Sequence, residues 1–594
     1  MEKTKEKESL SIKEQIKVLR FLLQFAKKEK IRFGFAIFFG IVQASVSVSL
    51  PFVLKQFMDT HLRQNAYEFG LLLYFALLYL GLSLVNALAQ FGRWYLFEQG
   101  AVGMGNETRR AIYKKIHTMG LGFFDKTPAG WLITRITSDT DLLQFCFVFI
   151  MVLTGLFSFI ASFIGLSLIE SNLSWILFAL LPFLFLAVIL YQKLSSVAYQ
   201  KMRESLSEIN TKLNEYLVGI RIIHVFHEQG RITNEFEKNN AHYFKMRQKV
   251  IQINSIFLRS FVSFLSNMGM VLSLFFFAQI SFTQVVAAGV VYAFITNLQQ
   301  VFEPIGNMME LLSNFSAGIV QGKRILTVME TDGENPFNDE GSQRKIQLGK
   351  IEFRHVGFSY DGLTKVLDDV SFIVQPGETL AIVGHTGSGK STIINVLMRF
   401  YEFQTGDILI DDISIRQFSK KELREKVGLI LQDSQLFVGS VRENIRFMHP
   451  NLSEEDLMEA SRLSQAHHFI EKLEAGYDEA VVEGGQAFSQ GEKQLLSFAR
   501  TIALDPKILV LDEATANVDS QTEYQIQVAL KKMRKNRTTL AIAHRLSTIR
   551  DADNILVMDH GAVVEAGNHE ELMDLNGLYK EMYQLQMERG KQNI

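Results

Sequence analysis

The sequence predicts two domains of different fold class, an α-helical domain that spans a membrane and, after it, a soluble α/β domain. Of the 594 residues, 48% are hydrophobic and 21% are charged, and the mean hydropathy of +0.11 is high for a wholly soluble protein. Almost all of this hydrophobic excess lies before residue 325. The later residues show short apolar runs separated by glycine-containing turns, which is typical of an α/β domain.

Six apolar stretches before residue 325 are long enough to cross a bilayer, which requires about 20 mostly apolar residues. They lie at approximately 33–55, 67–92, 145–168, 173–192, 256–280 and 284–312. Buried helices of a soluble protein rarely run so far without a charge, so we interpret these stretches as membrane spans. The first is too long for a signal peptide, and about thirty polar or amphipathic residues precede it.

Lysine and arginine gather before the first span, after the second and after the fourth, whereas the alternate short loops hold almost none. The cations after the second span are Arg93, Arg109, Arg110, Lys114, Lys115, Lys126 and Arg135. Because cations on short loops stay on the cytoplasmic side, both termini are expected in the cytoplasm. We therefore expect a multi-pass protein of the inner or plasma membrane.

The two long cytoplasmic segments, about 93–144 and 193–255, keep a helical periodicity, so the membrane helices should continue well beyond the bilayer. Residues 123–130 (Phe-Phe-Asp-Lys-Thr-Pro-Ala-Gly) supply a turn in the first segment, because proline and glycine interrupt a helix. Residues 13–29 mix apolar side chains with lysines and predict a helix along the inner membrane surface.

A polar stretch rich in glycine, asparagine and acidic residues follows the last span. We therefore divide the chain into a membrane domain (1–325), a linker (326–348) and a soluble domain (349–594). The formal net charge of −2 argues against a nucleic-acid partner. The single cysteine, Cys146, excludes an internal disulfide framework and a thiolate metal site.

Residues 384–391 (Gly-His-Thr-Gly-Ser-Gly-Lys-Ser) match the Gly-x4-Gly-Lys-Ser phosphate-binding loop at every position. An apolar strand precedes the motif and a helix follows it, which is the context that a chance glycine-rich turn would lack. Glycines let backbone N–H groups surround phosphates, Lys390 supplies a positive charge, and Ser391 offers a hydroxyl to Mg²⁺. ATP and Mg²⁺ are the expected ligands, and the expected nucleotide-binding residues here are Gly384, His385, Thr386, Gly387, Ser388, Gly389, Lys390, Ser391 and Thr392.

Two further apolar strands end in polar residues. The strand at 508–511 ends in Asp512 and Glu513, and the strand at 539–543 ends in His544. In a parallel sheet, groups at the carboxyl ends of strands converge on the ligand. We expect Asp512 to hold Mg²⁺ through water and Glu513 to polarise the attacking water, whereas His544 could hydrogen-bond the terminal phosphate.

Together these residues resemble the ATP-binding-cassette exporters, and the resemblance covers nearly the whole chain. It implies an α-helical six-span transmembrane domain followed by an α/β P-loop nucleotide-binding domain. It also implies that Tyr360 stacks on adenine and that Gln432 senses Mg²⁺ and the attacking water. Asp519 matches the family's D-loop, and His544 matches its switch histidine.

The membrane half fits the same resemblance. Residues 123–130 resemble the first coupling helix of the family, and residues 215–221 resemble the stretch after the second. In the family, the second coupling helix reaches across to the nucleotide-binding domain of the opposite subunit. The resemblance therefore implies that the working unit contains a second half-transporter.

The signature segment, residues 488–492, departs from the family's Leu-Ser-Gly-Gly-Gln. Ser489 and Gly491 are retained, but Gln490 replaces a glycine and Glu492 replaces the glutamine. A carboxylate there would repel the phosphate that the signature contacts, and a side chain at 490 would restrict close backbone approach. The chain's own catalytic motifs are intact, so we expect one subunit of a heterodimer, with a homodimer as the alternative.

The expected function is ATP-driven export of hydrophobic or amphipathic small molecules through alternating access, as in multidrug exporters. The polar residues scattered in the spans include Gln43, Asn86, Gln90, Asn267 and Asn297. Such residues line a path or bond neighbouring helices, and the composition fits amphipathic, hydrophobic or cationic cargo. A lipid or lipid-linked molecule is the alternative cargo. An ATP-gated channel or regulator is a further alternative, against which the intact catalytic residues argue.

Overall fold

The structure, a computed structural model, describes residues 11–592 except 63–68, 142, 172, 332, 334–343, 433, 448, 450, 483, 513–519 and 543–548. For 143–148 and 303–317, among others, it describes the backbone alone. The chain forms two compact units. Unit 1 comprises Met1–His117 and Pro128–Asp332, and unit 2 comprises Thr118–Thr127 and Gly333–Ile594.

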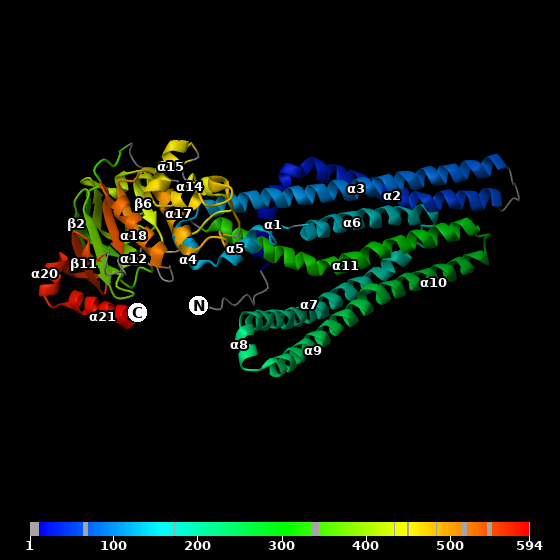
Figure 1. Cartoon of the computed structure of the whole chain (residues 1–594). Coiled ribbons are helices and arrows are strands. Elements are labelled where there is room, and N and C mark those ends of the chain that lie inside the picture. Colours follow the sequence, from blue (N-terminus) through cyan, green and yellow to red (C-terminus); the bar gives the residue numbers. More distant parts are fainter. Residues whose placement is uncertain are drawn as a thin grey trace. The chain divides into compact units, whose positions relative to one another are not determined.

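Unit 1 is helical throughout its described part (Figure 1). Its helices are α1 (Ile12–Ala26), η1 (Lys27–Glu29), α2 (Lys30–Phe57), η2 (Met58–Leu62), α3 (Phe69–His117), α5 (Ala129–Ile136), α6 (Leu143–Ile169), α7 (Trp175–Val218), α8 (Ile220–Val225), α9 (Gln229–Asn254), η3 (Ser255–Phe261), α10 (Val262–Ser281) and α11 (Ala288–Glu330). Helix α2 contacts α3, α6 and α11, whereas α7 contacts α9 and α10.

Among the described residues, five helices are long and apolar enough to cross a membrane, with a mean hydropathy of 1.8 to 2.3 over their best windows. They cover five of the six predicted spans. The sixth, 284–312, overlaps α11, but its last part has no described side chains. On α3, Leu77, Leu84 and Phe91 are 57%, 60% and 66% exposed, as expected of side chains that face lipid.

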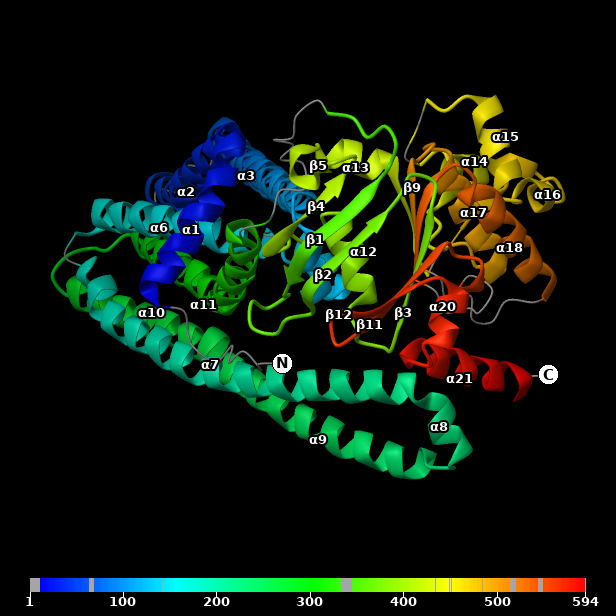
Figure 2. The same ribbon diagram turned by 90° about the vertical axis from the view of Figure 1, so that its left-hand side faces the viewer.

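The predicted extension of the helices beyond the bilayer is confirmed. Helix α3 has 49 residues and α7 has 44, which at 1.5 Å per residue gives about 74 and 66 Å. A hydrocarbon core of roughly 30 Å accounts for less than half of each length. Helix α8 joins α7 to α9, and these two long helices lie antiparallel (Figure 2).

The predicted amphipathic helix near the N-terminus is present as α1. Ser11 and Glu14 form a capping box at its start, which satisfies two backbone N–H groups. Val18 and Leu22 are buried, and a side chain on Gly322 of α11 would collide with both. The helix is therefore anchored on α11, and its place at the membrane surface stays a prediction.

Unit 2 contains three sheets in its described part, with strand orders β2-β1-β4-β5, β12-β11-β3-β10-β9-β6 and β7-β8. The strands are β1 (Ile351–Phe358), β2 (Leu367–Val374), β3 (Thr379–Gly384), β4 (Thr405–Ile410), β5 (Ile413–Ser414), β6 (Val427–Ile430), β7 (Gly439–Ser440), β8 (Ala480–Val481), β9 (Ile508–Asp512), β10 (Thr538–Ile542), β11 (Asn554–Asp559) and β12 (Ala562–Gly567). In the largest sheet, β11, β3, β10, β9 and β6 are parallel, and β12 is antiparallel at the edge.

The helices of unit 2 cover both faces of this parallel sheet. They are α4 (Leu121–Lys126), α12 (Lys390–Leu397), α13 (Lys420–Lys426), α14 (Val441–Ile445), α15 (Glu454–Leu463), α16 (His467–Ile470), α17 (Gln490–Ile502), α18 (Ser520–Arg534), α20 (His569–Asp574) and α21 (Leu578–Gln592). Strand β9 alternates between two cores: Val510 packs with α12, whereas Leu509 and Leu511 pack with α17 and α18. The parallel sheet therefore has no solvated face around β9, as its apolar sequence predicts.

The predicted interruption of the first cytoplasmic extension is confirmed, but it contains a short helix. Helix α4 ends before Thr127, and Pro128 caps the start of α5. The segment 118–127 belongs to unit 2, although the sequence assigned it to the membrane domain. The predicted linker begins inside α11, and 334–343 lie outside the described residues, so the boundaries at 325 and 348 stay a prediction.

Candidate functional site

The loop 384–391 connects β3 to α12 and depends on glycine at its two ends. Gly384 and Gly389 have φ values of 155° and 100°, which strain any residue with a side chain. A Cβ on Gly384 would lie 2.3 Å from the Met558 carbonyl oxygen, and one on Gly389 would lie 2.9 Å from the Val366 carbonyl oxygen. The loop therefore curls tightly and presents its backbone to a ligand at the start of α12.

The polar groups of this loop fit a phosphate. Lys390 donates hydrogen bonds from Nζ to the carbonyl oxygens of Gly384 and His385, at 2.8 and 2.9 Å. Burial lowers the pKa of Lys390, while the carboxylate of Asp512 acts in the opposite direction. The hydroxyl of Ser388 is buried and has no hydrogen-bond partner among the described residues, so an anionic oxygen would satisfy it.

The remaining residues predicted to bind the nucleotide differ in their exposure to solvent. His385, Thr386 and Gly387 are exposed on the loop, and Ser391 is exposed at the first turn of α12. Thr392 is buried and contacts the predicted adenine-stacking residue, with its hydroxyl oxygen 3.2 Å from that of Tyr360. The phosphate loop and the aromatic residue are therefore brought together.

Tyr360 is held by neighbours that the sequence did not indicate. Asn395 of α12 donates to the Tyr360 hydroxyl at 3.0 Å, and the Tyr401 ring packs edge-on with a centroid distance of 4.9 Å. The Tyr401 hydroxyl in turn donates to the carboxylate of Asp125 on α4. Tyr360 itself is 40% exposed, so part of its side chain stays accessible to a base. An aromatic residue shortly after the loop helix was the one available signal for Tyr401.

The carboxyl ends of three strands lie side by side at the phosphate loop. Asp512 pairs in register with Ile542 of β10, and Ile542 pairs with Ile382 of β3, two residues before the loop begins. On the other side of β9, Ile430 of β6 pairs with Leu511. Gln432 follows two residues after Ile430 and is exposed. The sequence-predicted Glu513, Asp519 and His544 lie outside the described residues.

The donors available for a metal ion are oxygens: the Ser391 hydroxyl, the Gln432 side-chain amide and the Asp512 carboxylate. Mg²⁺ prefers oxygen ligands, and it is usually bound through one or two carboxylates together with substrate phosphates rather than by a protein cage. The donor set fits Mg²⁺ bound together with a nucleotide.

The signature segment forms the start of α17. Ser489 is the N-cap, and its hydroxyl accepts a hydrogen bond from the backbone N–H of Glu492 at 3.3 Å. The Glu492 carboxylate accepts from the backbone N–H of Ser489 at 2.8 Å. This capping box fixes a negative charge at the helix start, beside the serine expected to face a phosphate. Gln490 is exposed and Gly491 is buried.

Comparison with known proteins agrees with this geometry. Residues 33–305 match the family described as the ABC transporter transmembrane region, and residues 367–516 match the family described as ABC transporter. The protein exp8 of Streptococcus pneumoniae serotype 4, named as an ABC transporter ATP-binding protein, is 40% identical over 575 residues, which cover 96% of this chain and 98% of exp8.

Two further relatives carry a cargo or an activity in their names. YheH of Bacillus subtilis, named a probable multidrug resistance ABC transporter ATP-binding/permease protein, is 39% identical over 86% of this chain and 76% of its own length. The ATP-dependent lipid A-core flippase of Syntrophus aciditrophicus is 31% identical over 97% of this chain and 96% of its own. The similarity therefore spans both the helical half and the α/β half.

Proposed function

Because this chain belongs to the ABC transporter family and is a multi-pass membrane half-transporter that binds and hydrolyses ATP, we propose that it exports hydrophobic or amphipathic compounds across the cytoplasmic membrane. The observation that carries the proposal is that a phosphate-binding loop with converging strand ends and a set of membrane-length helices stand on one chain. Both termini would lie in the cytoplasm, as the distribution of Lys and Arg indicates.

The proposed chemistry uses the residues named above. Lys390, the loop backbone and the Ser388 hydroxyl, which has no partner in the described part of the chain, would hold the phosphates. Ser391, Gln432 and Asp512 would hold Mg²⁺. Bound Mg²⁺ would neutralise charge on the phosphates. Glu513 would accept a proton from the attacking water, and His544 would bond the terminal phosphate.

We assign α4 the role of connecting nucleotide occupancy to the membrane domain. Its Asp125 accepts a hydrogen bond from Tyr401, whose ring packs on Tyr360, the proposed adenine platform. A change in the position of Tyr360 would thus reach α4 through two direct contacts. The chain continues from α4 into α5 and the membrane helices.

A second coupling contact would come from another half-transporter. Unit 2 has a largely apolar cavity of about 470 Å³ whose lining includes Phe124, Leu429 and Phe447. In unit 1, Ile222 and Val225 of α8 are 63% and 72% exposed. Exposed apolar side chains on such a short helix support docking on a partner, and we propose that the cavity receives the corresponding segment of the second subunit.

The favoured assembly is a heterodimer, supported by the Glu492 charge at the signature. This chain would supply the catalytic residues of the working site, and the partner would supply an intact signature. Purified alone, the chain is expected to show little ATPase activity, which phosphate release measures directly. A stable dimer of this chain alone with full activity would favour the homodimer instead.

Repair of the signature is expected to activate the second nucleotide site. In the double variant Glu492→Gln and Gln490→Gly, glutamine keeps the capping box while the negative charge is removed. Two unit charges 4 Å apart interact by about 1 kcal/mol in water, so a rise in turnover of roughly fivefold is expected. The measurement is phosphate release in a complex that also carries Glu513→Gln, so that only the second site turns over. An unchanged rate would show that Glu492 does not weaken the site.

Transport tests the proposal as a whole. The complex in lipid vesicles, supplied with external Mg²⁺ and ATP, is expected to accumulate hydrophobic dyes against a gradient, and a Lys390→Ala complex is not. The alternative cargo, a lipid, is supported by the similarity to a lipid A-core flippase. Movement of a labelled lipid between leaflets without dye uptake would select that alternative. Absence of ATP-dependent movement of either probe would refute the export function.

A further inference from the structure

Unit 1 encloses a polar cavity between α2, α3, α6 and α11, with a volume of about 290 Å³. Its lining includes Gln43, Ser47, Gln90, Arg93, Ser162 and Gln300. Polar residues among membrane helices are costly, and where they face an interior cavity they commonly mark a substrate or ion pathway. The cavity is therefore a candidate binding site.

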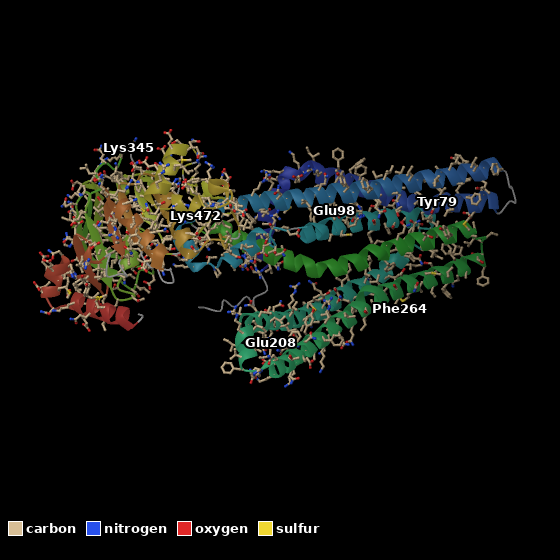
Figure 3. The ribbon with its side chains drawn as sticks, viewed as in Figure 1. Tyr79, Glu98, Glu208, Phe264, Lys345 and Lys472 are labelled. Atoms are coloured by element: carbon tan, nitrogen blue, oxygen red, sulfur yellow. The ribbon has the colours of Figure 1, made fainter. Side chains whose placement is uncertain are left out.

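Arg93 is the one charged residue among those that line the cavity. It lies on α3 between Tyr79 and Glu98, the two residues of that helix labelled in Figure 3. Its Nε is buried and has no hydrogen-bond partner, and no carboxylate within the described part of the chain pairs with it. The guanidinium carbon lies 4.9 Å from the Trp94 ring centroid.

Neighbouring polar groups could complete an anion site. The Ser162 side chain is 1% exposed, and its hydroxyl has no partner among the described residues. Gln43 and Gln90 also line the cavity. By contrast, Ser47 and Gln300 bond each other at 3.4 Å and are already satisfied. The donors that remain are a guanidinium, a hydroxyl and amides, the set that carboxylate and phosphate oxygens accept from.

The stem of Arg93 packs against a glycine of α2. A Cβ on Gly40 of α2 would lie 3.5 Å from Cδ of Arg93 and 3.1 Å from Cγ2 of Thr154 on α6. The contact with Arg93 is ordinary van der Waals packing, and the close approach that glycine eases is the one between α2 and α6. Arg93 lines the cavity between these helices, whereas a long cationic side chain near a helix end can also snorkel to the bilayer surface.

We propose that this cavity binds the anionic head group, a carboxylate or a phosphate, of an amphipathic cargo, with Arg93 as the charge that pairs with it. The inference rests on the proposed export function and narrows its substrate class. A volume of about 290 Å³ is at the lower end of the roughly 300–1,000 Å³ typical of small-molecule sites, which gives ample room for a head group, and the proposal places the acyl chain against the surrounding apolar helices. A cationic cargo, which the composition alone also fitted, is repelled by Arg93.

Direct binding tests the proposal without ATP. The assembled complex in neutral maltoside detergent is titrated with oleate, hexadecyl phosphate and the uncharged oleyl alcohol, and dissociation constants are measured by equilibrium binding. Arg93→Gln is expected to raise the dissociation constant of at least one of the two anions by at least about tenfold. The dissociation constant of oleyl alcohol is expected to change less than about twofold. Arg93→Lys is expected to bind with intermediate affinity. Arg110→Gln, on the same helix but with a 73% exposed side chain, should match the wild type.

The outcomes distinguish a carboxylate from a phosphate head group, and they test anion binding separately from the proposed export function. Loss of oleate binding alone assigns a carboxylate, and loss of hexadecyl phosphate binding alone assigns a phosphate. Equal loss for oleyl alcohol, or no loss for either anion in an Arg93→Gln complex that still binds ATP, overturns the proposal. If the Arg93→Gln complex does not assemble, binding to the wild-type complex is the test. The proposal is also overturned if the wild type binds neither anion more tightly than oleyl alcohol. Because no hydrolysis is involved, a complex that fails to transport can still bind the anion.

Discussion

In the assembled complex, Glu513→Gln is expected to lower ATP hydrolysis by about 10²- to 10⁴-fold, the usual contribution of a general base, and to leave ATP binding intact. The amide has nearly the shape of the carboxylate but cannot accept the proton of the attacking water. Glu513 follows Asp512, and Asp512 pairs in register with the strand beside the phosphate loop. Phosphate release and binding of a fluorescent ATP analogue measure the two properties separately.

The matched control for this variant is Glu492→Gln, the same chemical change at the signature segment. It should not lower hydrolysis, because the Glu492 carboxylate bonds the backbone of its own helix and is not proposed to touch the water. Export should fall together with hydrolysis in the Glu513→Gln complex. Unchanged turnover would show that Glu513 is not the general base. It would not contradict the assignment of residues 384–391 as the ATP-binding loop.

The second large effect is expected from Asp139→Asn in unit 1. The Asp139 carboxylate pairs with two arginines. It lies 2.5 Å from the guanidinium of Arg135 and 3.9 Å from that of Arg324 of α11. The Arg135 and Asp139 side chains are only 8% and 4% exposed. Removing one partner of a buried ion pair leaves an uncompensated charge, which costs about 3–5 kcal/mol. The apparent unfolding temperature of unit 1 should fall clearly.

An exposed ion pair in the same unit provides the control. Glu228 and Arg231, at the start of α9, are 44% and 67% exposed, and such pairs contribute about 0–1 kcal/mol. Glu228→Gln should therefore leave the unfolding temperature of unit 1 nearly unchanged. Thermal unfolding followed by tryptophan fluorescence is suited to this comparison, because the Arg135 guanidinium carbon lies 4.4 Å from the Trp131 ring centroid. Equal effects of the two variants would show that burial does not set the strength of the Asp139 cluster.

Much of the fold could be predicted because its causes are local. Long apolar stretches have no stable place in water, so six spans and the helical extensions were predicted from hydropathy and periodicity, and five membrane-length helices are found among the described residues. The strands ending at Gly384 and Asp512 were predicted from short apolar runs next to polar residues. The end of a helix depends on packing as well as on sequence, and α11 continues to Glu330, inside the predicted linker.

The candidate site was predictable in its loop and less so around it. Glycines with positive φ are required by the loop itself, whatever surrounds it. The partners of Tyr360 come from Asn395 and Tyr401, which carry no motif. The Glu492 carboxylate was predicted to repel a phosphate, but its hydrogen bond to the Ser489 backbone became visible only in the helix geometry.

By itself, the sequence determined that the chain has a membrane half, a phosphate-binding loop and strand-end carboxylates, because these depend on composition and on residues adjacent along the chain. Only the tertiary structure decided that Arg93, one cation among many in the sequence, faces a polar cavity. It likewise brought Asp125 to Tyr401 and Arg324 to Asp139. These pairings join residues far apart in the chain, so no local pattern encodes them.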